Sequence, residues 1–140
     1  MEGAVVVDTM IASAWLGAKQ TRRYSRWTNV LRDVRWVLPF VVVAEMRFGA
    51  EVTGWGPRRR DMLDRLVSRS GVIPPIEEVT DAYVDLRARC VRDGHGLGAK
   101  DHEADRWVAA VAIAGQIPLA SEDGIFDHVP DLRRVAPAAE

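Results

Sequence analysis

The sequence predicts an α/β fold in which a short, mostly parallel central sheet is covered by helices on both faces. Short apolar runs alternate with amphipathic helical patterns along the whole chain, an order typical of βαβ units. The first run, residues 5–7, consists of three valines, as expected of a strand buried on both faces. A length of 140 residues, of which 48% are hydrophobic, is enough for a single domain over 1–140 with its own core.

Two helices and a strand are expected next. Asp8 or Thr9 can cap a helix that ends near Gly17, because a short polar side chain there accepts a hydrogen bond from a free N–H of the first turn. Residues 22–34 predict a second helix, since their apolar side chains recur at helical spacing. A β-branched and apolar stretch at 36–38 predicts a strand, which the following proline ends.

The middle of the chain predicts two more helices and a strand. Residues 40–50 carry a helical pattern, and the Gly-Trp-Gly-Pro stretch at 54–57 breaks it. Pro57 suits the first position of the next helix, because its missing N–H would have no helical partner there. Residues 71–75 then predict a short strand followed by a turn.

The last part of the chain repeats the alternation. A long helix is expected over 77–92, followed by a glycine-rich segment at 94–98 that indicates a mobile link. The next helix covers 101–114 and leads to a strand near 118–120. Residues 132–135 predict a final edge strand.

Composition narrows the class of protein. No apolar run approaches the roughly 20 residues that span a bilayer, and the N-terminus lacks a signal-like pattern, so we expect a cytoplasmic protein with no membrane contact. Cys90 is the only cysteine, which excludes an intrachain disulfide, and its place on an apolar helical stripe indicates an inert core residue.

The net charge of −1 conceals clusters of arginine. Arginine makes forked contacts with phosphate, so the clusters favour a polyanionic partner such as nucleic acid. A solvated helix surface would give the same pattern, and charge alone leaves both interpretations open. The clustered residues are Arg22, Arg23, Arg26, Arg58, Arg59, Arg60, Arg65, Arg87, Arg89 and Arg92.

Four acidic residues adjoin or interrupt apolar segments, where a carboxylate is costly to bury without a partner. Such a set in one small domain would repel itself unless a cation lay among its members. Because ligands bind at the carboxyl ends of parallel strands, residues that directly follow strands are expected at that edge. The sequence therefore predicts a metal site formed by Asp8, Glu45, Asp105 and Asp123.

Three of the four acids also have an ordinary structural explanation. Asp8 could be a helix N-cap, Asp105 could interact with a helix dipole, and Asp123-Gly124 is a common turn dipeptide. Glu45 fits neither a cap nor a turn, because it stands in mid-helix. Its spacing from Val41, Val42 and Phe48 predicts that it lies on the apolar stripe rather than the solvent face.

The chemistry of these ligands favours Mg²⁺ or Mn²⁺. Carboxylate oxygens are hard donors, and the chain has neither clustered cysteines nor paired histidines for zinc. His95, His102 and His128 lack ligand spacing. The 94–98 segment is not a phosphate loop, since Lys100 is not followed by Ser or Thr.

At these residues the chain resembles the PIN-domain nucleases, most closely the VapC-type toxins of bacterial toxin–antitoxin pairs. The resemblance covers nearly the whole length, and the order and spacing of its motifs make it specific. The motifs are Val7-Asp8-Thr9, Leu38-Pro39 leading to Val43-Ala44-Glu45-Met46-Arg47-Phe48-Gly49-Ala50, Asp105-Arg106-Trp107-Val108-Ala109-Ala110, and Pro118-Leu119-Ala120-Ser121-Glu122-Asp123.

The resemblance implies a PIN-like three-layer α/β/α sandwich, a homodimer, and a Mg²⁺- or Mn²⁺-dependent endoribonuclease that a cognate antitoxin neutralises. It implies that the four acids bind the metal and form the catalytic site. It also implies supporting or substrate-binding positions at Thr9, Arg47 and Ser121. The helices that carry Trp15, Trp27 and Trp55 offer more aromatic surface than a small core needs, which indicates cover by a second copy or an antitoxin; core packing is the alternative.

Other functions remain open at this point. A phosphatase that forms an aspartyl-phosphate needs a second Asp two residues after Asp8, where this chain has Met10. A receiver domain needs paired acids before a strand and a later lysine, and neither is evident. A non-catalytic interaction module on the same fold and a DNA-directed nuclease are compatible with the sequence.

Overall fold

The computed structural model describes residues 3–17 and 22–139, which form one four-stranded sheet in the order β3-β2-β1-β4. All strand pairs are parallel. The strands are β1 (Ala4–Val7), β2 (Arg35–Pro39), β3 (Gly71–Ile73) and β4 (Leu119–Ala120). Every strand lies where a run of apolar or β-branched residues predicted one, and the parallel sheet is confirmed.

The predicted edge strand at 132–135 is reduced to a single bridge. Leu119 pairs in parallel with Arg134 through hydrogen bonds from Leu119 N to the Arg133 carbonyl and from Val135 N to the Leu119 carbonyl. Because β4 has only two residues, it offers this segment too short a partner for a longer ladder. The chain then passes along α2 (Arg22–Arg32), where the Ala138 N–H donates to the Arg26 carbonyl.

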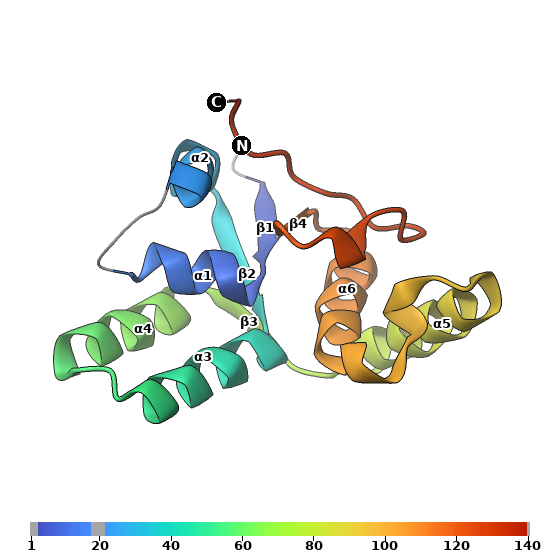
Figure 1. Ribbon diagram of the computed structural model, residues 1–140, viewed down its shortest axis with the longest axis horizontal. Helices are drawn as coiled ribbons and strands as arrows, with labels where there is room; N and C mark the ends of the chain where they lie inside the picture. Colours follow the sequence, from blue (N-terminus) through green and yellow to red (C-terminus); the bar gives the residue numbers. More distant parts are fainter. Residues whose placement is uncertain (1–2, 18–21, 140) are drawn as a thin grey trace.

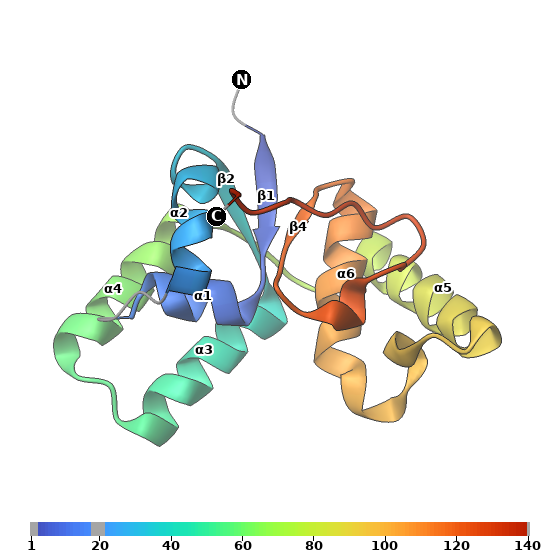
Figure 2. The same ribbon diagram turned by 45° about the horizontal axis from the view of Figure 1, so that its top comes forward.

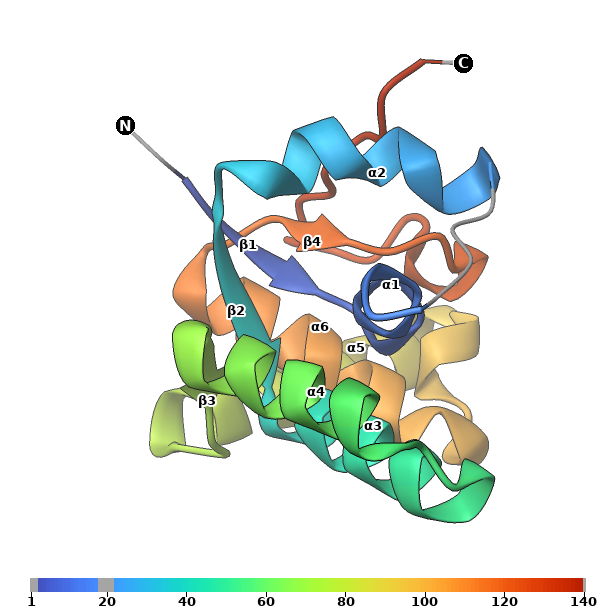
Figure 3. The same ribbon diagram turned by 90° about the vertical axis from the view of Figure 1, so that its left-hand side faces the viewer.

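Helices cover both faces of the sheet, which confirms the three-layer α/β/α arrangement. One side carries α1 to α4, and the other carries α5 and α6 (Figures 1 and 3). The remaining helices are α1 (Thr9–Trp15), α3 (Phe40–Thr53), α4 (Pro57–Arg69), α5 (Glu77–Asp93) and α6 (Glu103–Gly115). Each begins within two residues of its predicted start, as expected from the Asp8 cap of α1 and the proline at the start of α4.

The two helical layers meet at the carboxyl end of the sheet. The Phe40 ring, at the start of α3, packs edge-on against Trp107 of α6, with 5.5 Å between ring centroids. Trp107 in turn stacks on Tyr83 of α5 at 4.1 Å. Figure 2 shows how this places the start of α3 beside α6, below the ends of β1 and β4.

The expectation of a mobile link at 94–98 is wrong. The segment contains a short 3-10 helix, η1 (Gly96–Gly98), and its Leu97 side chain is fully buried. A Cβ at Gly98 would lie 2.9 Å from the Val91 nitrogen, so the glycine permits close packing against α5 rather than flexibility. Glycine content indicated a loop correctly, but the single apolar residue in it determines how the loop packs.

Trp27 and Trp15 pack against other residues of this chain. Trp27 is buried and donates its indole N–H to Glu122 Oε1 at 2.7 Å. The half-buried Trp15 packs edge-on against Trp36, with centroids 5.1 Å apart. Core packing therefore explains Trp27, and the prediction that it contributes partner-binding surface is wrong. Cys90 is buried as expected, and its burial raises the pKa of the thiol.

Within the described ranges, no helix combines the length and the apolar character that crossing a membrane requires.

Candidate functional site

Asp8 lies at the carboxyl end of β1, where that strand adjoins β4. Its backbone N–H donates to the Ala120 carbonyl, so the last residues of the two strands fix its position. Its Oδ1 accepts a hydrogen bond from the Thr9 N–H at 2.8 Å and caps α1. Its Oδ2 accepts one from the Ser121 hydroxyl, also at 2.8 Å. Asp8 is therefore both the helix cap that one interpretation predicted and a carboxylate placed at the expected edge.

The pKa of the Asp8 carboxyl is raised above its ordinary value. Burial is the main cause, and the negative charges of Asp105 and Glu45 raise it further. The hydrogen bonds from Ser121 and Thr9 act in the opposite direction, because they stabilise the ionised form. Two other predicted acids thus lie close enough to Asp8 for their charges to act on it.

Glu45 belongs to this group, although the prediction of its environment is wrong. It is exposed rather than packed on the apolar stripe, and its Oε1 accepts a hydrogen bond from the Thr9 hydroxyl at 2.8 Å. The buried residues of α3 are Val42, Val43, Met46 and Ala50. Glu45 stands beside that stripe, and Phe48, which we expected to share it, is 69% exposed.

Asp105 occupies the first turn of α6 and is half-buried. His102, one turn earlier, places its Nδ1 2.9 Å from Asp105 Oδ2. The neighbouring Arg106 is 1% exposed. Its guanidinium donates to the Tyr83 hydroxyl and to the carbonyls of Leu97 and Ala99, which fixes the segment that leads into η2 (Lys100–His102).

Asp123 is placed differently from the other three acids. It is exposed, and its Oδ1 accepts a hydrogen bond from the Ile125 N–H at 3.0 Å, capping the short 3-10 helix η3 (Gly124–Phe126). Its backbone N–H donates to the Ser121 hydroxyl. The Ser121 hydroxyl therefore connects the Asp123 backbone to Asp8. The Asp123 carboxylate caps the turn that the Asp-Gly dipeptide predicted.

The predicted supporting residues are divided between two places. Thr9 and Ser121 each bind an acid directly, as described above. Arg47 is exposed and lines a separate hollow between α3 and α4, together with Glu51, Arg60 and Asp64. The structure does not bring Arg47 to the acids.

The donor set agrees with a hard divalent cation in its chemistry. Asp8, Glu45 and Asp105 supply only carboxylate oxygens, and no cysteine is close, since Cys90 is buried in α5. Among the described residues, however, no three His, Cys, Asp or Glu side chains are grouped closely enough to hold an ion as they stand. Like charges repel, and each carboxylate is turned toward a donor of the chain. Metal binding at these residues therefore requires side-chain rotation.

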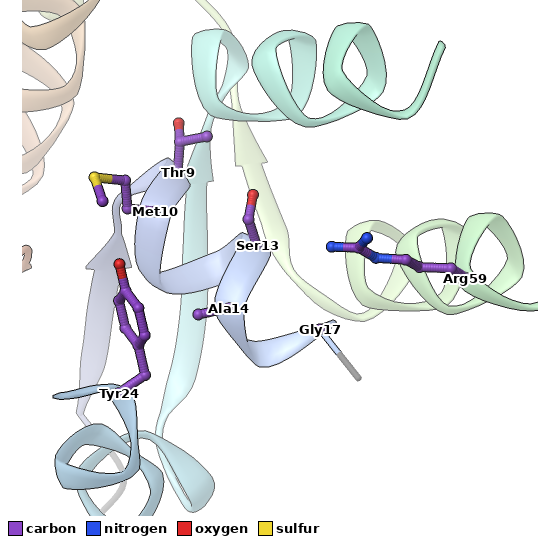
Figure 4. A pocket seen from close by; sticks show the side chains of 7 residues that line it. All are labelled: Thr9, Met10, Ser13, Ala14, Gly17, Tyr24 and Arg59. Atoms are coloured by element: carbon purple, nitrogen blue, oxygen red, sulfur yellow. The ribbon is translucent and has the colours of Figure 1, made fainter. Parts of the chain in front are cut away.

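Sequence reasoning missed two features beside the acids. His102 is three residues before Asp105, and this spacing, which places both on the same side of a helical turn, is the sequence signal for their contact. The second feature is a hollow next to Thr9 that Arg59 lines (Figure 4). By sequence, Arg59 is one member of a charged cluster, because sequence does not show which arginines form ion pairs.

Three comparisons connect the chain to known proteins. A family model described as the PIN domain matches residues 5–132. The curated protein "VapC ribonuclease Y4jK" of Sinorhizobium fredii is 28% identical over 125 residues, which cover 85% of this chain and 86% of that protein.

Two solved structures show the same fold. One is VapBC2 from Rickettsia felis bound to a DNA fragment from its promoter, with a TM-score of 0.76, 21% identity, and coverage of 94% of this chain and 97% of that chain. The other is VapBC-5 from Mycobacterium tuberculosis, described as a member of the VapBC family of toxin-antitoxin systems. It has a TM-score of 0.63, 22% identity, and coverage of 95% and 99%.

Proposed function

We propose that this chain, which belongs to the PIN-domain family, is an endoribonuclease dependent on a divalent metal and the toxin of a bacterial toxin–antitoxin pair. The relative at 28% identity is named a ribonuclease, and a structural neighbour is described as part of a toxin–antitoxin family. The observation that carries the proposal is geometric: Thr9 donates its N–H to Asp8 and its hydroxyl to Glu45, which brings two carboxylates together at the carboxyl end of β1. The charge of Asp105 also acts on Asp8.

Asp8, Glu45 and Asp105 would hold the ion, Mg²⁺ or Mn²⁺, with Asp123 as the fourth acid. When bound, such an ion lowers the pKa of a water molecule and offsets charge on the phosphate under attack. Thr9 orients Glu45, and Ser121 orients Asp8 through the hydrogen bonds already described. His102 holds Asp105. These contacts hold the three carboxylates near one end of the sheet, and the side chains would rotate away from them to bind the ion.

The partners follow from the same proposal. An RNA substrate, a cognate antitoxin and a homodimer are expected, with the whole of 1–140 acting as one nuclease domain. Its four strands share one sheet, which supports treating the chain as a unit. A cytoplasmic location follows, because the proposed substrate is cellular RNA.

The test is cleavage of single-stranded RNA by purified protein. Activity should disappear with a chelator and return with Mg²⁺ or Mn²⁺. Asp8→Asn and Asp105→Asn should each lower the rate by more than about 100-fold, because even outer-shell partners of a metal site contribute about 10–100-fold. Asp81→Asn, at an exposed position on α5, removes the same charge far from the acids and should leave the rate unchanged.

The same assay separates the alternatives. Single-stranded DNA of the same base sequence tests for a DNA-directed nuclease, which would cut the DNA in preference to the RNA. Cleavage that survives both acid substitutions, or that ignores the chelator, would contradict the assignment. Binding of RNA without any cleavage would indicate a non-catalytic module.

A further inference from the structure

A hollow of about 400 Å³ opens beside Thr9, between α1 and the start of α4. This volume lies within the range of small-molecule sites, about 300–1,000 Å³. Because the Thr9 hydroxyl also donates to Glu45, the hollow adjoins the acids described above. Figure 4 shows Thr9 and Ser13 of α1 on one side and Arg59 reaching in from α4 on the other.

Unlike Arg60 and Arg65 on the same helix, Arg59 forms no ion pair within the described part of the chain. Its guanidinium lies over the Trp55 ring, 3.6 Å from the ring centroid, and its buried Nε has no hydrogen-bond partner among the described residues. Arg60, in contrast, donates to Glu51 and to the carbonyls of Trp55 and Ala50. Arg65 pairs with Asp61. The Arg59 guanidinium thus has no anion beside it among the described residues, and its end faces the hollow, which favours an anionic ligand there.

The rest of the hollow agrees with a nucleotide. The Ser13 hydroxyl forms no side-chain hydrogen bond within the described part of the chain and faces the same space as Arg59 (Figure 4). Met10, which is 52% exposed, and the half-buried ring of Tyr24 form an apolar wall at the other end. A guanidinium fork matches a phosphate, and an aromatic or apolar wall matches the face of a base.

We infer that this hollow binds one nucleotide of single-stranded RNA adjacent to the bond that is cut, with Arg59 and Ser13 on its phosphate. The inference rests on the proposed nuclease function and adds a substrate subsite to it. Trp55 packs against the guanidinium, whose central carbon lies 3.6 Å from the ring centroid, and this contact restricts the fork before RNA arrives. The acids and the arginine then act on different phosphates: the acids act at the phosphate that reacts, and Arg59 binds the neighbouring one.

Binding can be tested without cleavage. Anisotropy of a fluorescein-labelled RNA of about ten nucleotides, within the usual site sizes, is measured in a chelating buffer over a series of salt concentrations. Arg59→Met keeps the packing on Trp55 but removes the charge, and it should weaken RNA binding about tenfold. The slope of log affinity against log salt should fall by about 0.7, because one phosphate contact with a single strand is lost.

Two further variants make the test specific. Arg59→Lys keeps the charge without the fork, so it should restore the salt slope and only part of the affinity. Arg32→Met removes an equal charge from an exposed position in the last turn of α2, outside the hollow and outside the arginine clusters, and should change affinity less than about twofold. In cleavage assays, Arg59→Met should raise KM and leave kcat nearly unchanged.

The outcomes distinguish this inference from the function on which it rests. If the wild-type protein neither binds nor cleaves RNA, both are wrong. If it cleaves RNA and Arg59→Met has the same affinity, salt slope and KM, only the subsite is wrong. A variant that loses binding to a co-encoded protein while RNA binding stays unchanged would make the hollow a protein-binding site and overturn the inference.

Discussion

The Ser121 hydroxyl donates a hydrogen bond to Asp8 Oδ2 at 2.8 Å and joins two loops that are 113 residues apart in the chain. The same oxygen accepts a hydrogen bond from the Asp123 N–H at 3.1 Å. Ser121 is buried, so neither partner can easily exchange it for water. One hydroxyl thus couples the loop after β1 to the loop after β4, and the position of the Asp8 carboxylate depends on both.

Ser121→Ala should therefore destabilise the protein by about 1–2 kcal/mol, because it leaves a backbone N–H and a carboxylate oxygen without their partner. It should also raise the pKa of Asp8 further, since the Ser121 hydrogen bond lowers it. Urea unfolding measures the first effect. Ser68→Ala, at an exposed serine on α4, is the control and should change stability very little. Equal stability of the two variants would mean that the Ser121 contact is not maintained in solution.

The raised pKa of Asp8 predicts how metal-free stability depends on pH. An acid with a folded-state pKa above its unfolded value binds protons more tightly when folded, so its contribution to stability decreases as pH rises. The loss of stability caused by ionising the buried Asp8 is absent below the ordinary pKa of 3.8. It is complete above the folded-state pKa. Asp8→Asn can keep both hydrogen bonds, because its Oδ1 accepts from Thr9 and its amide donates to the Ser121 oxygen.

Asp8→Asn should accordingly be more stable than the wild type at neutral pH in a chelating buffer, and the difference should shrink as pH approaches 3.8. Urea unfolding at several pH values checks both the sign and the trend. Asp81→Asn provides the baseline for an exposed acid. A variant that is less stable at neutral pH, or a difference that does not change with pH, would contradict the repulsion and burial assigned to Asp8.

Sequence patterns predicted the fold and the positions of two acids well, because both depend on local order. The strand of three valines ends directly before Asp8, and α6 begins close to Asp105, so the parallel topology brings them to one edge. Glu45 was also placed in the correct helix. Its exposure was not predicted, since spacing from apolar residues does not show which of them are buried: Val42 is, and Phe48 is not.

Other features depend on contacts between segments that are distant in the sequence, so local sequence patterns could not predict them. Arg106 lies among apolar residues of α6, but its acceptors come from α5 and from the segment around η1. Arg59 belongs to a run of three arginines, and only the structure shows that Arg60 is paired while the Arg59 Nε is not. Asp123 could be a ligand or a turn residue by sequence, and the structure shows it capping η3.

Two substitutions of Asp123 separate its role as a helix cap from the role of its negative charge. Asp123→Asn keeps an oxygen for the Ile125 N–H, so metal-free stability should change by less than about 0.5 kcal/mol, whereas Asp123→Ala should lose about 1 kcal/mol. If Asp123 is the fourth metal acid, Asp123→Asn should still show a smaller rise in melting temperature on adding Mg²⁺. A rise equal to that of the wild type would reduce the site to three acids.

His102 should act as a positioning residue for Asp105. Removing its ring in His102→Ala frees Asp105 Oδ2, and we expect about a tenfold loss of cleavage rate and a higher Mg²⁺ requirement, as for other outer-shell partners. His128→Asn is the matched control: His128 is exposed, and asparagine tolerates its φ of 61°. If both variants cleave RNA at the wild-type rate over a range of Mg²⁺ concentrations, the His102 contact has no part in activity.

Arg106 should contribute more to stability than Arg65 does. Arg106→Met fills much of the same volume but leaves the Leu97 and Ala99 carbonyls and the Tyr83 hydroxyl without their donor, for an expected loss of about 3 kcal/mol in urea unfolding. Arg65→Met removes an exposed ion pair with Asp61 and should lose less than about 1 kcal/mol.

A less disruptive variant tests the same contacts if Arg106→Met does not fold. Tyr83→Phe removes only one acceptor and should lose about 1 kcal/mol while keeping the ring stacked on Trp107. Because Arg106 fixes the segment that leads to His102, Arg106→Met should also lower cleavage per folded molecule. Loss of stability without any loss of activity would show that Asp105 keeps its position without the Arg106 contacts.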